Sequence, residues 1–250
     1  MRVDNGWRAR LIGVLGLLLL WEILSLWLAV PAFPGPGRAA RAFFLALSTG
    51  LAYHFWSSAY RVVASMVISF LLAVPLGLFL GRATAFDRYF TPVIYLLYPI
   101  PKVVFLPVVM IVLGLGNGAK IFLISLVLFF QILITTRDAA RGINPALIHS
   151  VQSLGADWWD LYRHVIWPAA LPEILTSLRI ATGTAIAVLF FSETIASQEG
   201  LGYYLLDAWT RYAYDQMFAG IMAMGLLGFG LYLGLEWLER RVCSWKYLQV

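Results

Sequence analysis

The chain has 250 residues, of which 61% are hydrophobic and only 12% are charged, and its mean hydropathy is +0.81. This composition excludes an ordinary soluble domain and predicts a polytopic membrane protein, because several apolar runs are long enough to cross a bilayer. The net charge of +5 includes no basic cluster with interleaved aromatic residues, which argues against nucleic-acid binding, and the single cysteine excludes an internal disulfide and a multi-cysteine metal site.

The first apolar run extends from Leu11 to Val30 and follows three arginines. Basic residues before a leucine-rich core also occur in cleaved signal peptides, but this run is too long for a usual signal core, so we favour a retained span. Both alternatives deliver Pro31 onward to the outside. A Pro- and Gly-rich break follows, and Arg38 to Trp56 is predicted to form an amphipathic helix at the outer surface, which completes an N-terminal unit of residues 1–57.

Residues 58–250 are predicted to form a core with five further spans. Gly77 and Gly81 lie four residues apart near the end of the first of these, a spacing that favours close helix contact. The next apolar block contains three prolines, which predicts a short or broken helix. Lys102, between these prolines, has two open alternatives: it lines a polar pathway, or it extends toward the cytoplasmic end of a span. The five predicted spans are Ala59 to Leu80, Pro92 to Leu115, Ile121 to Thr136, Pro172 to Ser192 and Met217 to Leu238.

The basic residues predict the orientation of the chain. Six spans place most lysines and arginines on one side, whereas the last loop on the other side is mainly acidic. Because positive charge is retained on the inside, both termini are expected in the cytoplasm. Arg82, Asp87 and Arg88 would then form a short cytoplasmic loop, and the Asn144 to Arg179 stretch would face the cytoplasm as well.

The stretch that begins at Asn144 has a recognisable local pattern. Asn144, followed by a proline, predicts a capped helix start, and Gly155 predicts its end. Asp157 predicts the cap of a second short helix that Pro168 terminates. Two such amphipathic helices would form a knob on the inner face. The knob serves either as an interfacial anchor or as a surface that docks into a groove of a soluble partner, and the residues alone favour neither.

The spacing from Gly155 to the Val165–Pro168 run resembles the cytoplasmic motif of binding-protein-dependent ABC importer permeases, written E-A-A-x3-G-x9-I-x-L-P. The likeness is to the branch that imports nitrate, sulfonates, taurine and similar small solutes. It extends through PIPKVVFLP at Pro99 to Pro107 and the GLG triplets that begin at Gly114 and Gly200. The first three motif positions hold His149, Ser150 and Val151, so a salt bridge from the family glutamate is absent.

The resemblance implies an all-α polytopic fold with six transmembrane helices, the type I ABC importer permease fold, with a cytoplasmic coupling helix at residues 144–168. It implies a permease subunit of an ATP-driven importer that forms the pathway for a small organic or inorganic anion. The implied partners are a second permease copy in a homodimer, two cytoplasmic ABC ATPases, an external substrate-binding protein and the lipid bilayer of the bacterial inner membrane. The chain lacks G-x-x-x-x-G-K-[ST], so it is not expected to be an enzyme or to bind a cofactor; ATP and Mg would be bound by the ATPase.

Two sets of candidate site residues follow, and neither is catalytic or metal-binding. The expected ATPase-coupling surface consists of Leu147, Ile148, His149, Val151, Leu154, Gly155, Ala156 and Asp157. The candidates for a pathway or gate are Ser65, Ser69, Lys102, Thr182, Thr184, Ser192 and Glu193. The hydroxyl groups have interhelical hydrogen bonding as an alternative role. Glu193 lies at a span end beside a GLG triplet, where it would bound an external gate or anchor the loop.

Two other function classes were weighed. An ATP-independent secondary carrier or channel would be expected to show an inverted repeat and buried charges at mid-membrane, and no convincing repeat is present. An intramembrane enzyme requires paired aspartates, a serine–histidine pair or clustered histidines, whereas the three histidines fall outside the predicted spans.

Overall fold

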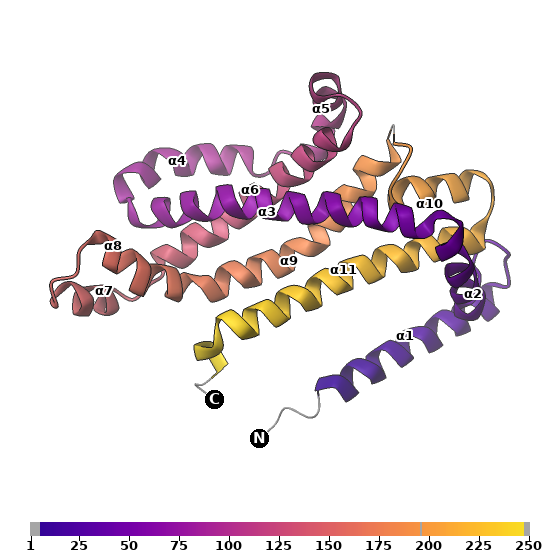
Figure 1. The fold of residues 1–250 in the computed structure, drawn as a ribbon, viewed down its shortest axis with the longest axis horizontal. Coiled ribbons are helices and arrows are strands. Elements are labelled where there is room, and N and C mark those ends of the chain that lie inside the picture. The colour runs from indigo at the N-terminus through magenta and orange to yellow at the C-terminus, as the bar shows by residue number, and fades with distance from the viewer. Residues whose placement is uncertain (1–5, 196, 248–250) are drawn as a thin grey trace.

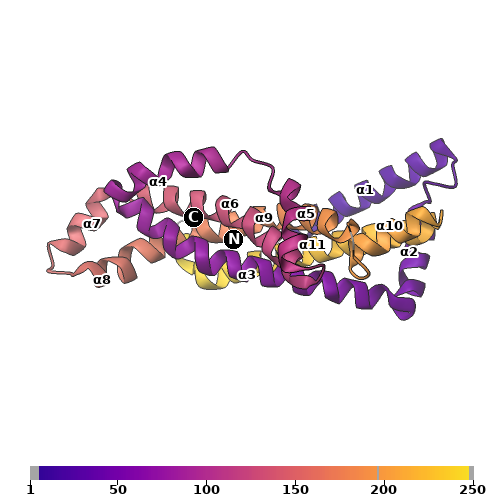
Figure 2. The same ribbon diagram turned by 90° about the horizontal axis from the view of Figure 1, so that it is seen from above.

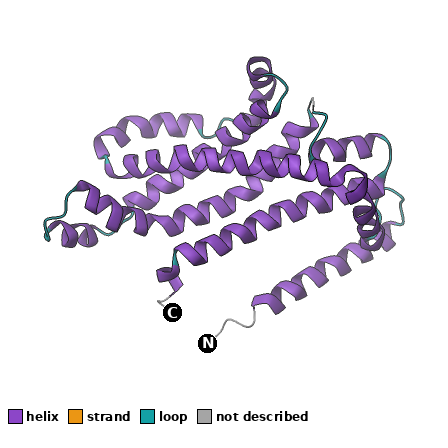
Figure 3. Cartoon of the chain, in the orientation of Figure 1, coloured by secondary structure: helices purple, strands orange, loops and turns teal. Residues whose placement is uncertain are grey.

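The structure is a computed structural model that describes residues 6–195 and 197–247, with side chains from Leu11 onward apart from residues 196 and 247. Within these ranges the chain is helical and contains no strand, which confirms the predicted all-α class (Figure 3). The side chains of the three arginines before the first apolar run lie outside the described part.

Among the described residues, five helical segments are long and apolar enough to cross a bilayer, and six if one bent helix pair counts as a span. This agrees with the six predicted spans. The bounds are α1 (Gly6–Leu28), α2 (Pro36–Ala46), α3 (Ala52–Arg82), α4 (Thr84–Leu97), α5 (Leu106–Leu113), α6 (Asn117–Arg141), α9 (Trp167–Thr194), α10 (Leu201–Thr210) and α11 (Tyr214–Val242). Helices α7 (Pro145–Gln152) and α8 (Trp158–Leu161) project from one end, and α2 and α10 lie at the other (Figures 1 and 2).

The centre of the bundle is the packing of α3 against α6, with α9 alongside α6. A Cβ atom on Gly81 would lie 2.5 Å from the carbonyl oxygen of Arg137 and 2.7 Å from Cβ of Ala140. A Cβ atom on Gly77 would lie 2.8 Å from Cβ of Thr136. The two small residues therefore let α3 and α6 approach closely, as their spacing predicts.

The external segment before α3 is shorter than predicted. Helix α2 ends at Ala46, and a short π-helical stretch, Leu47–Leu51, contains Gly50 with a φ of 122°. Glycine adopts this conformation without the steric cost that a Cβ atom imposes, so the chain bends here and α3 begins at Ala52. The expected boundary between residues 57 and 58 consequently lies inside α3.

The predicted break in the third apolar block is confirmed. Helix α4 and the segment formed by a 3-10 turn and α5 meet at an angle of 76°. Lys102 lies at the break, and its Nζ donates hydrogen bonds to the carbonyl oxygens of Leu97, Tyr98 and Ile100 at 3.1, 3.0 and 3.3 Å. The same ammonium lies 4.6 Å from the centre of the Phe130 ring on α6. Lys102 therefore supplies hydrogen bonds to carbonyl oxygens at and just beyond the end of α4.

Residues 82–88 do not form the predicted loop. Ala83 alone separates α3 from α4, so Asp87 and Arg88 belong to the first turns of α4. The Asp87 carboxylate lies 2.6 Å from Arg137 Nε and 3.3 Å from Arg141 Nη1, both on α6. A carboxylate in the first turn is favoured by the helix dipole, and these arginines add a second reason for the helix to begin here.

Pro168 does not end the second knob helix. Helix α8 continues through a π-helical turn, Tyr162–Ile166, directly into α9, and Pro168 lies in the first turn of α9. The Trp167 amide bonds five residues back, to the Tyr162 carbonyl oxygen. The missing N–H of Pro168 thus falls where the hydrogen-bond register changes, so it costs no regular bond. The fifth span therefore begins well before Pro172.

The two ends of the bundle differ in their number of basic residues. Helix α11 runs toward the end that carries α7 and α8, whereas α1 begins nearer the middle of the molecule (Figure 1). The α7–α8 end holds more arginines and lysines than the α10 end, where Arg38, Arg61, Lys120 and Arg211 lie beside Glu193, Glu199, Asp207 and Asp215. The basic residues of the α7–α8 end are Arg82, Arg88, Arg137, Arg141, Arg163, Arg240, Arg241 and Lys246.

Candidate coupling surface and external polar cluster

The local structure predicted around the knob is present. The Asn144 Oδ1 atom accepts a hydrogen bond from the Ala146 amide at 2.9 Å, and Asp157 Oδ1 accepts one from the Asp160 amide at 2.8 Å. Both helix starts are therefore capped by side chains. Gly155 has a φ of 83°, a left-handed conformation that ends the turn after α7.

The expected coupling residues divide between two environments. Leu147 and Leu154 are 54% and 86% exposed, and Gly155, Asp157 and His149 are exposed as well. Ile148 is buried, Val151 packs against the core, and Ala156 is half-buried. The apolar residues predicted for this surface thus have two roles. Ile148 and Val151 hold α7 against the bundle, whereas Leu147 and Leu154 are exposed at the surface of the chain. Trp158 and Trp159 extend this exposed apolar surface.

The second candidate region is a buried ion pair at the opposite end. Arg61 Nη1 on α3 donates to Glu193 Oε1 on α9 at 2.6 Å, and both side chains are at most 1% exposed. The Glu193 carboxylate also accepts hydrogen bonds from Ser58 Oγ at 2.8 Å and from the Gly202 amide at 2.9 Å. These donors offset the free-energy cost of removing the Glu193 carboxylate from water.

The polar cluster, which consists of Arg61, Glu193 and their hydrogen-bond partners, also holds the loop between α9 and α10. Arg61 donates to the Glu199 carboxylate and, at 3.0 Å, to the Glu199 carbonyl oxygen, while Arg61 Nε donates to Asn117 Oδ1 at 2.7 Å. Lys120 Nζ donates to Ser197 Oγ at 3.0 Å. The guanidinium therefore joins α3, α6, α9 and the loop.

The contacts of Glu193 explain why glycine occupies positions 200 and 202 of the GLG triplet. Gly200 has a φ of 108°, and a Cβ atom on it would overlap the Glu193 carboxyl group. The Gly200 amide donates to His54 Nδ1 at 3.1 Å, and a Cβ atom on Gly202 would lie 2.7 Å from Glu193 Cβ. The glycines thus allow the loop backbone to reach the buried carboxylate. His54 lies in the first turn of α3.

Glu199 is the partly exposed carboxylate of the cluster, with 28% of its side chain exposed. The Tyr53 hydroxyl donates a hydrogen bond to its carboxylate, and this bond, helped by the nearby charge of Arg61, holds the pKa of Glu199 below its ordinary value. Sequence reasoning singled out Glu193 but missed Arg61. The available signal was an arginine inside an apolar run, because an ionisable residue in a span is usually paired or functional.

The remaining pathway candidates mostly make hydrogen bonds within or between helices. Ser65 Oγ donates to the Arg61 and Ile121 carbonyl oxygens, and Ser69 Oγ donates to those of Ser65 and Ser125. Thr182 and Ser192 bond to carbonyls of their own helix, and Thr184 is half-buried on α9. The serines of α3 therefore contribute to packing against α6.

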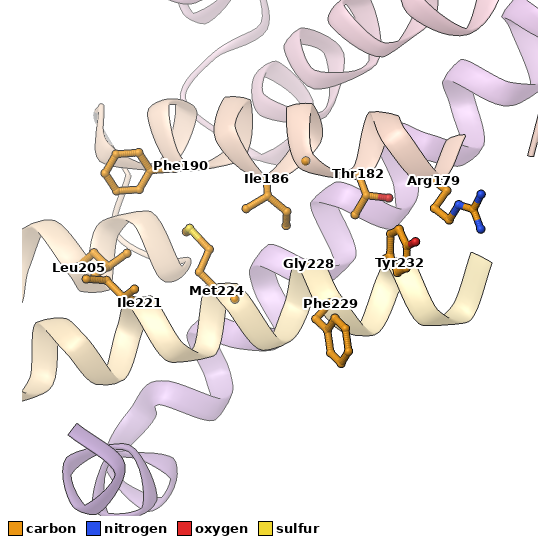
Figure 4. Close-up of a pocket in the computed structure, with 12 residues that line it drawn as sticks. Arg179, Thr182, Ile186, Phe190, Leu205, Ile221, Met224, Gly228, Phe229 and Tyr232 are labelled. Carbon is orange, nitrogen blue, oxygen red and sulfur yellow. The ribbon is translucent and has the colours of Figure 1, made fainter. Parts of the chain in front are cut away.

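Thr182 also lines a cavity of about 650 Å³ between α9 and α11 (Figure 4). Most of its lining is apolar, including Ile186, Met224 and Phe229. Arg179 lies at one end, 3.3 Å from Glu239 Oε2 and 5.5 Å from the centre of the Tyr232 ring. Both cation contacts tie α9 to the last turns of α11.

Comparison with known proteins decides the identity. Residues 73–243 match the family described as the binding-protein-dependent transport system inner membrane component. The chain belongs to this family. This permease is 32% identical over 243 residues to the taurine transport system permease protein TauC of Escherichia coli (strain K12), covering 94% of this chain and 88% of TauC.

A second relative is the putative aliphatic sulfonates transport permease protein SsuC of Bacillus subtilis (strain 168), which is 30% identical over 252 residues, covering 98% of this chain and 90% of SsuC. Among solved structures, a chain of the MetNI methionine ABC transporter in inward-facing conformations superposes with a TM-score of 0.66 at 19% identity, covering 79% of this chain and 98% of that chain. This likeness shows the fold alone. The permease is thus a transmembrane subunit of an ABC importer of the taurine and sulfonate branch, and an ATP-independent carrier or channel is set aside.

Proposed function

We propose that this permease forms, with a second copy of itself, the membrane pathway for a small organosulfonate that an external binding protein delivers. TauC and SsuC, whose names specify taurine and aliphatic sulfonates, support this solute class because each matches most of the chain. The excess of basic residues at the α7–α8 end supports an inner-membrane orientation with both termini in the cytoplasm.

In this proposal a cytoplasmic ABC ATPase docks on α7 and α8. The ATPase, and not the permease, binds ATP and Mg²⁺. The observation that carries this step is the 86% exposure of Leu154, together with the exposure of Leu147 and the two tryptophans of α8. An apolar helical surface that projects beyond the spans at the basic end fits helix-in-groove recognition by a soluble partner. His149 occupies the position of the family glutamate, so this contact relies on apolar packing.

The test is the Leu154→Asp variant in the complete transporter. Leu154 contacts little within the chain, so the substitution leaves the fold intact and places a charge in the proposed interface. We expect loss of the copurifying ATPase and of solute uptake. The matched control is Trp209→Asp, since Trp209 is 58% exposed at the opposite end of the bundle.

A second variant, Gly155→Arg, adds bulk and backbone strain at a φ of 83° where a Cβ atom would meet nothing within 4 Å. We expect membrane insertion without coupled uptake. Normal ATPase copurification and normal sulfonate uptake in both variants would overturn the proposed docking surface.

A further inference from the structure

A second cavity, of about 750 Å³, lies between the end of α4, α6 and α9. Unlike the apolar cavity between α9 and α11, it carries polar side chains on several sides. This size and this mixture of apolar walls with a few polar groups are typical of small-molecule sites. The polar residues that line it are Tyr98, Gln131, Thr135, Glu173, Thr176, Ser177 and Lys246.

The two threonines of the cavity present hydrogen-bond acceptors. Thr135 Oγ1 donates its proton to the Gln131 carbonyl oxygen at 3.1 Å, and Thr176 Oγ1 donates its proton to the Pro172 carbonyl oxygen at 2.8 Å. A hydroxyl group has a single proton, so only the lone pairs of these oxygens remain for a ligand. They therefore suit a group that donates hydrogen bonds.

Glu173 adds a negative charge on the same wall. It precedes Thr176 by three residues on α9, which places the two side chains on one face of the helix. Within the described residues its carboxylate makes no ion pair or hydrogen bond, whereas Glu193 and Glu239 are both paired with cations. Glu173 is exposed near the start of α9, and an unpaired carboxylate on the wall of a cavity fits a ligand that carries positive charge.

The other charged group of the lining is of opposite sign. Lys246 Nζ lies 2.8 Å from Glu239 Oε1, and the Gln131 carboxamide, which has no hydrogen-bond partner in the described part of the chain, offers two donor protons. A solute that is only anionic would meet repulsion from Glu173 without compensation. A solute with both charges would find a partner for each.

We propose that this cavity is a contact site for a sulfonate that also carries an ammonium group. The carboxylate of Glu173 and the hydroxyl oxygens of Thr135 and Thr176 bind the ammonium group. The sulfonate oxygens accept hydrogen bonds from the Gln131 carboxamide, on the side of the cavity where Lys246 lies. The inference rests on the proposed function and deepens it, because the names of the two relatives include taurine, which has an ammonium group, and aliphatic sulfonates, which do not. Glu173 thus selects the amino-substituted solute.

The test is protection of an introduced thiol in the purified permease–ATPase complex without binding protein. Ile180 lines the cavity and is 65% exposed, and the native Cys243 is fully buried, so Ile180→Cys supplies a single accessible thiol. We expect taurine to slow maleimide labelling at lower concentration than ethanesulfonate, which has the same carbon chain without the ammonium group.

Adding Glu173→Gln is expected to raise the taurine concentration needed for protection about tenfold, because one charge-assisted hydrogen bond is lost, and to leave the ethanesulfonate value unchanged or lower. Glu173→Asp should retain the preference. The matched control is Glu22→Gln on α1, a carboxylate remote from the cavity, which should alter neither value.

The outcomes separate the inference from the proposed function. Equal protection by both compounds, protection by neither, or a taurine preference that survives Glu173→Gln overturns the inference. ATP hydrolysis by the reconstituted complex with its binding protein is measured in parallel. If neither sulfonate stimulates hydrolysis, the proposed solute class is wrong.

Discussion

Arg61 shows how a charged residue can be fully buried at the end of a membrane bundle. Its guanidinium donates to Glu193, Asn117 and two groups of Glu199, so most of its N–H groups have partners. Such a residue stabilises the fold only while the partners are present, because removal of one leaves an uncompensated buried charge. The pair thus holds α3, α9 and the loop between α9 and α10 in one arrangement.

The Glu193→Gln variant tests this arrangement. Glutamine keeps the shape of the side chain but not the charge, so Arg61 loses its buried counter-ion, and we expect a loss of about 3–5 kcal/mol in the free energy of unfolding. The measurement is the thermal unfolding midpoint in detergent. The double variant Arg61→Gln, Glu193→Gln should recover part of the loss, and an unchanged midpoint in Glu193→Gln would show that the pair does not hold the loop.

The loop anchor at Glu199 depends on pH in a defined direction. Because the pKa of Glu199 is lower in the folded chain than in the unfolded chain, its contribution is complete above the ordinary glutamate value of about 4.3 and is lost as the pH falls through the folded value. Hydrogen exchange of residues 197–202, corrected for the intrinsic pH dependence of amide exchange, should therefore stay slow above that ordinary value and accelerate as the pH falls below it. Tyr53→Phe removes the hydrogen bond that contributes most, so acceleration should begin at a higher pH; an identical profile would contradict this role of Tyr53.

Sequence reasoning reached part of this cluster. Glu193 stood out because it is an ionisable residue at a span end beside a GLG triplet. Its partner Arg61 lies 132 positions earlier in the chain, and no local pattern connects two residues at that separation. The same limit applies to Asp87 and Arg137, which lie on different helices and form an ion pair between α4 and α6.

At the scale of elements, the helix caps and the break in the proline-rich block were predictable, whereas the effect of Pro168 was not. Asn144, Asp157 and Gly155 act through their immediate neighbours, so the sequence indicates their roles. Pro168 terminates a helix only when its missing N–H breaks a regular bond, and a π-helical turn removes that condition. Whether such a turn forms depends on how α8 and α9 pack, which is a tertiary property.

The close approach of α3 and α6 yields a second stability prediction. Gly81→Leu would place side-chain atoms where the Arg137 carbonyl oxygen and Ala140 already lie, so we expect overpacking to cost at least about 1–3 kcal/mol and to lower the yield of folded permease. The matched control is Gly230→Leu on α11, where a Cβ atom would meet nothing within 4 Å. Monodispersity and thermal unfolding of the two purified variants measure the effect. Equal behaviour of both would mean that the helices are not in contact at Gly81.

At the scale of the whole molecule, the number of spans and the grouping of charge followed from hydropathy and from the distribution of lysine and arginine. The position of each helix around the bundle did not. The apolar window of α1, for example, has no buried residue, and α1 contacts the rest of the chain near its end, where Trp21 stacks on Phe218. Hydropathy identifies a span but does not tell which neighbour covers it.

The orientation of the bundle is open to a direct test with single thiols. Leu154 projects at the end that carries α7 and α8, and Trp209 on α10 lies at the opposite end. Their exposed fractions are 86% and 58%. Background labelling should be low because Cys243 is fully buried and burial raises the pKa of its thiol, which keeps it protonated at neutral pH. Since positive charge is retained in the cytoplasm, a membrane-impermeant maleimide should label Trp209→Cys in intact cells and Leu154→Cys only after permeabilisation. The reverse pattern would place α7 and α8 outside, where no ATPase could reach them, and would therefore refute the proposed coupling surface together with the orientation.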